Sequence, residues 1–215
     1  MLKIRELNVS IQSVRILRGV DLELPTGAVA GLIGRNGAGK TTLMRSIMGL
    51  LPASSGRVEF DDINLREVPP YGRSSLGIGY MPEERRLIPE LTVEENILLP
   101  AWAIGAKEGP ERLQKIYQMI PEMKTFTQRK AMELSGGQQK LVALGRALMC
   151  GHKLLLLDEP FEGVAPALAQ RLVEVVSELI KEGLTVILSE SNLQHSTAML
   201  DRVFQIDRGV VVQGG

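Results

Sequence analysis

A glycine-rich octapeptide near the N-terminus constrains the fold of this chain more than any other feature. The segment Gly34-Arg-Asn-Gly-Ala-Gly39-Lys40-Thr41 matches the pattern G-x-x-x-x-G-K-[ST]. An apolar stretch, 28–33, precedes it, and apolar residues at helical spacing follow it. This pattern joins a strand to a helix around a phosphate, so it predicts an α/β fold with a nucleotide-binding loop. The alternative, a glycine-rich turn with an incidental lysine, is disfavoured by that strand and helix context.

Each residue type in this segment has a chemical role in holding phosphate. Glycines let the backbone turn with its N–H groups toward the phosphate oxygens, and the N-terminus of the following helix adds a favourable dipole. We expect Lys40 to reach the β- and γ-phosphates and the Thr41 hydroxyl to ligate Mg²⁺. The predicted nucleotide-binding residues are Gly34, Arg35, Asn36, Gly37, Ala38, Gly39, Lys40, Thr41 and Thr42.

A second motif, which contains two acidic residues, also points to nucleotide binding. Four leucines run directly into two carboxylates in Leu154-Leu-Leu-Leu157-Asp158-Glu159. The run predicts a buried strand whose carboxyl end, where α/β sheets bind ligands, carries both acids. Asp158 is placed to hold Mg²⁺, directly or through water, and Glu159 to act as general base toward an attacking water. Alone, the pattern also fits a core strand that ends in a polar turn, and the phosphate loop upstream favours catalysis.

The composition narrows the range of functions. The 215 residues contain 25 Lys and Arg against 25 Asp and Glu, and this neutral balance argues against a nucleic-acid partner. The single cysteine, Cys150, cannot form an internal disulfide and suits a reducing cytosol. No apolar run reaches the roughly 20 residues that a membrane span needs, and the first residues lack the apolar region of a signal peptide.

Apolar strands alternate with amphipathic helices, which indicates a mostly parallel sheet covered on both faces. The segment from about 84 to 151 is mainly helical, so we expect a core formed by about 1–83 and 152–215 with a helical insertion between. The predicted strands are 14–24, 28–33, 57–60, 76–81, 154–157, 185–188, 203–206 and 210–212. The predicted helices are 94–102, 111–120, 138–150 and 166–181, with another after Gly39.

A third motif lies between the other two. In Leu134-Ser135-Gly136-Gly137-Gln138, a Ser-Gly-Gly sequence opens a helix, and such a start favours anions. As a bare string it is weak, but the order phosphate loop, LSGGQ, LLLLDEP resembles the ATP-binding cassette (ABC) ATPases over essentially the whole chain. The resemblance implies a P-loop NTPase core with an N-terminal antiparallel β-subdomain and an inserted α-helical subdomain.

The resemblance also implies an assembly. ATP would be held between residues 34–42 of one subunit and Ser135, Gly136, Gly137 and Gln138 of another in a head-to-tail homodimer or heterodimer with a paralogue. Closing and reopening of this dimer would drive a transmembrane permease from the cytoplasmic face of the membrane. Glu83, in Pro-Glu where most such ATPases have Pro-Gln, takes the position that senses the metal and the permease surface.

Two longer segments refine the resemblance. The sequence GIGYMPEERRLIPELTVEENI, together with DEPFEGVAP, looks like the ATPases of branched-chain amino-acid importers. That subfamily implies a periplasmic solute-binding protein as an indirect partner. A lipid or lipopolysaccharide transport ATPase is the alternative, since GIGY and DEPFxGV occur there too. Repair or ribosome-acting cassettes usually carry long insertions or tandem cassettes, and the sequence shows neither.

Three positions depart from the general family pattern. Ile11 stands where an aromatic residue usually stacks on adenine, Ser191 where a histidine usually contacts the γ-phosphate, and Val164 where an aspartate is usual. Ser191 donates one hydrogen bond but no charge, so a weakly active or catalytically idle nucleotide-binding subunit remains an alternative. His195 is a candidate substitute if a helix carries it to the face of Ser191, although packing or surface exposure is the commoner role for such a residue.

Overall fold

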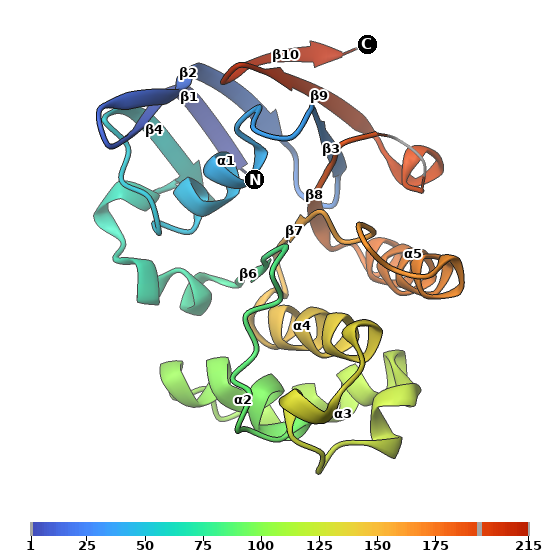
Figure 1. Ribbon diagram of the computed structural model, residues 1–215. Helices are drawn as coiled ribbons and strands as arrows, with labels where there is room; N and C mark the ends of the chain where they lie inside the picture. Colours follow the sequence, from blue (N-terminus) through green and yellow to red (C-terminus); the bar gives the residue numbers. More distant parts are fainter. Residues whose placement is uncertain (1, 193–194, 215) are drawn as a thin grey trace.

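The computed structural model describes residues 2–192 and 195–214, in which a six-stranded sheet forms the centre (Figure 1). Its strand order is β10-β9-β3-β8-β7-β6, and the pairs are parallel except β10 with β9. This arrangement brings the ends of strands that are far apart in sequence to one edge. The bounds are β3 (Val29–Ile33), β6 (Ile78–Met81), β7 (Leu154–Asp158), β8 (Thr185–Glu190), β9 (Arg202–Asp207) and β10 (Val210–Gly214).

A smaller antiparallel sheet contains most of the N-terminal part, in the order β2-β1-β4-β5. Along β1 the buried residues alternate, and their phase changes at a register shift between Ile4 and Leu7 where Glu6 has φ +47°. The bounds are β1 (Leu2–Ile11), β2 (Val14–Leu24), β4 (Ser55–Phe60) and β5 (Ile63–Asn64).

Helix starts follow local capping chemistry. Thr92 and Ser135 each form a reciprocal capping box with the Glu or Gln three residues on, and Pro166 occupies the first turn of its helix. The α-helices are α1 (Lys40–Ile47), α2 (Val93–Ile104), α3 (Gly109–Met119), α4 (Gly136–Cys150) and α5 (Pro166–Lys181). Short 3₁₀ turns occupy Leu65–Glu67, Pro70–Gly72, Ser74–Leu76, Pro121–Thr125, Ala131–Glu133 and Thr197–Met199.

The central sheet separates two apolar cores. On β7, Leu154 and Leu156 pack with α1 and the smaller sheet, whereas Leu155 and Leu157 pack with α4 and α5. A fully apolar strand is required because both faces are covered. Helices α2, α3 and α4 lie on the opposite side of the molecule from β1, β2 and β4 (Figure 1).

The predicted α/β class, with an antiparallel β-subdomain and a helical insertion, is confirmed. Strand β6 begins at Ile78 and not at residue 76, because a 3₁₀ turn precedes it and is capped by Gly77. Gly77 has φ +91°, a backbone angle that residues with a side chain rarely adopt. Helix α1 ends at Ile47, although the apolar residues that follow the phosphate loop at helical spacing continue to Leu50. The domain boundaries near residues 84 and 151 stay a prediction.

Candidate nucleotide site

The phosphate loop connects β3 to α1 and turns through two left-handed glycines. Gly37 has φ +80°, and Gly39, with φ +114°, precedes the first helical residue. A Cβ on Gly39 would also lie 3.0 Å from a Leu17 side-chain carbon, so both backbone angle and space favour glycine. Lys40 is buried, and its Nζ donates to the carbonyl oxygens of Gly34 and Arg35. The loop therefore wraps around its own lysine.

Glu159 lies directly beside this lysine. Its Oε1 is 3.0 Å from Lys40 Nζ, and both side chains are more than nine-tenths buried. The Ser191 Oγ is 2.8 Å from Glu159 Oε1 and 2.8 Å from Asn36 Oδ1, so its single proton is shared between two acceptors. Four predicted site residues from three parts of the chain thus form one hydrogen-bonded group.

The adjacent carboxylate, Asp158, is fully buried and fixed from two strands. Its Oδ1 accepts a 2.7 Å hydrogen bond from Ser189 Oγ, and its Oδ2 accepts one of 3.1 Å from Tyr80 Oη. Ser189 Oγ also accepts from the Glu159 backbone N–H at 3.0 Å. Burial, followed by the nearby Asp158 charge, raises the pKa of Tyr80 well above its usual value, which keeps the phenol a hydrogen-bond donor.

A cavity of about 450 Å³ runs along the inner side of the loop. Its lining combines the lysine, two hydroxyls and two carboxylates that phosphate transfer needs, so it is the candidate nucleotide site. The lining residues are Ile16, Asn36, Gly37, Gly39, Lys40, Thr41, Thr42, Glu83 and Glu159.

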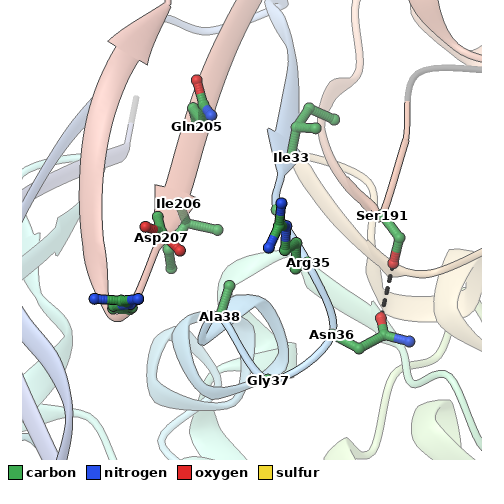
Figure 2. Close-up of a pocket in the computed structure, with 11 residues that line it drawn as sticks. Ile33, Arg35, Asn36, Gly37, Ala38, Ser191, Gln205, Ile206 and Asp207 are labelled. Atoms are coloured by element: carbon green, nitrogen blue, oxygen red, sulfur yellow. Dashed lines mark hydrogen bonds between the residues drawn. The ribbon is translucent and has the colours of Figure 1, made fainter.

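A second cavity, of about 550 Å³, lies on the outer side of the same loop. Figure 2 shows the loop between β9, with Gln205 and Asp207, and Ser191, which points at Asn36. Gly34, Arg35 and Ala38 line this outer cavity and not the inner one. It lacks Lys40, Thr41 and Glu159, so we assign the nucleotide to the smaller, inner cavity.

Negative charge is concentrated near the inner cavity. Burial raises the pKa of Glu83, and the charges of Glu162, Asp158 and Glu159 raise it further. Such a site favours a cation, and its oxygen donors match the preference of Mg²⁺. Within residues 2–192 and 195–214, no group of three or more His, Cys, Asp or Glu side chains is arranged to hold a metal. Binding of Mg²⁺ by the predicted ligands Thr41, Asp158 and Glu83 stays a prediction.

Asp158 is fully buried and does not line the inner cavity, and Ser191 lines the outer one. Two further sets of predicted residues also lie outside the inner cavity. Ile11 ends β1, pairs with Val14 and does not line the cavity, whereas Ile16 does. Ser135, Gly136, Gly137 and Gln138 open α4 and do not line it either. Ser135 and Gly136 are exposed, which leaves the start of this helix accessible to another molecule. Contact of either set with a nucleotide remains a prediction.

The helix that would carry His195 to the face of Ser191 is not found in the part of the chain that the structure describes. Neither Ser191 nor His195 is helical, and residues 193–194 lie outside the described residues. The His195 ring instead packs against Phe161, with centroids 5.4 Å apart. It does line a cavity of about 300 Å³ together with Glu159 and Ser191.

Three residues that organise the site were missed by the sequence reasoning: Tyr80, Ser189 and Lys140. Ser189 directly follows three apolar residues in β8, and Lys140 is a cation within the mostly buried part of a helix. Both are polar residues at apolar positions, and that signal was available in the sequence. Tyr80 gave no comparable signal.

Comparison with known proteins identifies the family. The family model described as ABC transporter matches residues 17–162. The chain belongs to the ABC transporter family. It is an ATP hydrolase of the transporter type. In the described residues, every helix is too short or too polar to cross a lipid bilayer.

Several relatives align with nearly the full chain. This ABC ATPase is 34% identical to the high-affinity branched-chain amino acid transport ATP-binding protein BraG of Pseudomonas aeruginosa, over 99% of the chain and 91% of BraG. It is 32% identical to the probable LivF protein of Archaeoglobus fulgidus, over 100% and 92%. It is also 30% identical to the lipopolysaccharide export protein LptB of Escherichia coli K12, over 94% and 84%.

Solved structures agree with the fold. The ADP conformation of the cassette MJ1267 superposes with a TM-score of 0.85 at 32% identity, covering 100% of this chain and 90% of that one. The dimeric cassette MJ0796 gives 0.86 at 25% identity, covering 98% and 96%.

Proposed function

We propose that this ABC ATPase powers the import of branched-chain or other hydrophobic amino acids through a membrane permease. The observation that carries this proposal is the similarity to BraG and LivF across almost the entire chain. In this proposal the protein is peripheral on the cytoplasmic face of the cell membrane, and a periplasmic solute-binding protein delivers the solute to the permease.

The site residues divide the chemistry of hydrolysis between them. Lys40 and the loop amides neutralise phosphate charge, and Thr41, Asp158 and Glu83 would hold Mg²⁺. The ion offsets the phosphate charge that develops during transfer. Glu159 accepts a proton from the attacking water, and the Ser191 hydroxyl orients the Glu159 carboxylate. No covalent intermediate forms, because water itself attacks the γ-phosphate.

A dimer follows from the half-site geometry. The start of α4 does not line its own cavity, yet the dipole at this helix N-terminus and the exposed Ser135 suit a phosphate. We propose that this end of α4 completes the cavity of a second copy or a paralogue, and a cassette of the same fold is known as a dimer. Closure on ATP brings the two half-sites together.

The variant Glu159→Gln tests the catalytic assignment. It keeps the shape of the carboxylate but is a poor base, so turnover falls by about 10²–10⁴-fold. ATP binding persists, and size-exclusion chromatography with Mg²⁺-ATP shows a dimer. Hydrolysis by Glu159→Gln at the parent rate contradicts the role of Glu159.

An uptake assay in the host organism tests which solute is transported. Deletion of the gene removes uptake of radiolabelled leucine, isoleucine and valine, and the parent chain restores it whereas Lys40→Ala does not. Lipopolysaccharide export is the second candidate, because LptB is also similar along most of the chain. Unchanged amino-acid uptake with a defect in lipopolysaccharide at the cell surface favours that candidate instead.

A further inference from the structure

The backbone of Glu159 adopts a conformation that needs external support. Its φ of +47° lies in the left-handed region, which is strained for a residue with a side chain. The strain falls where β7 ends, at the start of a turn closed by the Glu162 N–H donating to the Glu159 carbonyl at 3.2 Å. The φ at this residue sets the direction of its carboxylate.

Lys140, on α4, contacts both ends of this turn. Its Nζ donates to the Glu159 carbonyl at 3.0 Å and to the Glu162 carbonyl at 2.6 Å. The side chain is buried, with 4% of its surface exposed. Within the described residues it has no carboxylate partner at ion-pair distance, so its charge is directed to the two carbonyls. A buried cation placed on main-chain oxygens fixes the peptide that follows Glu159.

The helix that carries Lys140 is itself tied to the segment before it. Arg85 Nη1 donates to the Gly136 carbonyl and to Gln139 Oε1, both at 3.2 Å, and Arg146 donates to the carbonyls of Arg85 and Arg86. The start of α4, which begins with the LSGGQ motif, is thereby held to the residues just after Glu83. Lys140 links this unit to Glu159.

We propose that Lys140 is a positioning residue, whose protonated ammonium clamps the turn 159–162 and so aims the Glu159 carboxylate at the attacking water. The inference rests on the function proposed for Glu159. It assigns Lys140 no contact with nucleotide or water. The clamp connects the half-site at the start of α4 with the catalytic carboxylate of the same chain.

If Lys140 acts as this clamp, hydrolysis is sensitive to alkaline pH, because the clamp needs a protonated ammonium. Burial, followed by the nearby Arg85 charge, lowers the pKa of Lys140 to about 8, although the charges of Glu162, Glu159 and Glu83 oppose this. As pH rises through about 8, Lys140 loses a proton, and with it its positive charge and one of its three N–H donors. We therefore expect kcat of the parent to fall above pH 8, with a smaller change in KM for ATP.

The experiment measures kcat and KM of the full-length chain, with Mg²⁺-ATP between pH 6.5 and 9.5, for Lys140→Arg, Lys140→Gln and Lys140→Met. We expect kcat at pH 7.5 to decrease in that order, by about tenfold or more for Lys140→Met, while KM changes less than about threefold. Lys140→Arg stays charged and lacks the decline above pH 8. The exposed Lys153, paired with Asp61, provides the control Lys153→Gln, which keeps the parent profile.

The outcomes separate the positioning role from the proposed function. Equal kcat in all three Lys140 variants refutes the clamp, as does a decline above pH 8 that persists in Lys140→Arg. A loss of thermal stability together with a parallel rise in KM shows a purely structural role and also refutes it. Parent-like hydrolysis by Glu159→Gln refutes the function proposed for Glu159, whatever the Lys140 series shows. An inactive Glu159→Gln with a parent-like Lys140→Met refutes the positioning role alone.

Discussion

Removal of the Ser191 hydroxyl tests whether this neutral group contributes to hydrolysis by orienting the Glu159 carboxylate. In the structure its Oγ lies 2.8 Å from Glu159 Oε1 and 3.4 Å from Lys40 Nζ. A hydrogen bond to a charged group contributes about 1.5–3 kcal/mol, and each 1.4 kcal/mol corresponds to a factor of about ten. If the bond orients Glu159 during hydrolysis, Ser191→Ala lowers kcat by about 10–150-fold.

The assay is steady-state phosphate release at saturating Mg²⁺-ATP, with thermal unfolding measured in parallel. Ser191→Thr is the matched control, because it keeps a hydroxyl at the same position and retains most of the parent activity. The Lys40–Glu159 ion pair remains in both variants, so the fold itself is preserved. A kcat for Ser191→Ala within twofold of the parent refutes the argument, since the hydroxyl then contributes nothing to the reaction.

Two further predictions concern stability. The carboxyl of Glu190 is buried, and burial, opposed by the Ser196 hydroxyl, raises its pKa from 4.5 to about 7, so the parent loses stability as pH rises from about 4.5 through 7. Urea unfolding should show Glu190→Gln gaining about 1–3 kcal/mol over the parent at pH 8 and less at pH 5; an equal difference at both pH values contradicts this. In Gly79→Ala the new Cβ would lie 2.2 Å from the Ala147 carbonyl oxygen of α4, and we expect a loss of about 1–3 kcal/mol or more by the same assay. In the control Gly72→Ala the new Cβ meets nothing nearer than a side-chain methyl of Val68 at 3.2 Å, and we expect a loss of less than about 1 kcal/mol, so similar losses in the two variants would contradict the packing argument.

The local elements were predictable because their signals are local. The helix 166–181 was predicted with the bounds that it has, since Pro166 starts it and apolar residues recur along one face. The leucine run 154–157 became β7, and its alternation between two cores follows from the two-residue period of a strand. The phosphate loop needed only its glycines, its lysine and the flanking elements.

Parts of the site were not predictable, because they depend on which strands become neighbours. Lys40 and Ser191 are 151 positions apart, and they meet because β3 pairs with β8. Tyr80 and Asp158 meet because β6 pairs with β7. No periodicity within a single strand specifies its partner in a sheet, so these contacts had no local signal.

By itself, the sequence determined the α/β class, the phosphate loop, the two carboxylates at the end of an apolar strand and the helix that starts after Ser135. Only the tertiary structure decided that Glu159 has a left-handed backbone, that Lys140 reaches across the following turn, and that Ile16 and not Ile11 lines the cavity. The reason is physical. Propensity, capping and hydrophobic period act over a few residues, whereas backbone strain, buried charge and cavity shape arise only when distant segments pack together.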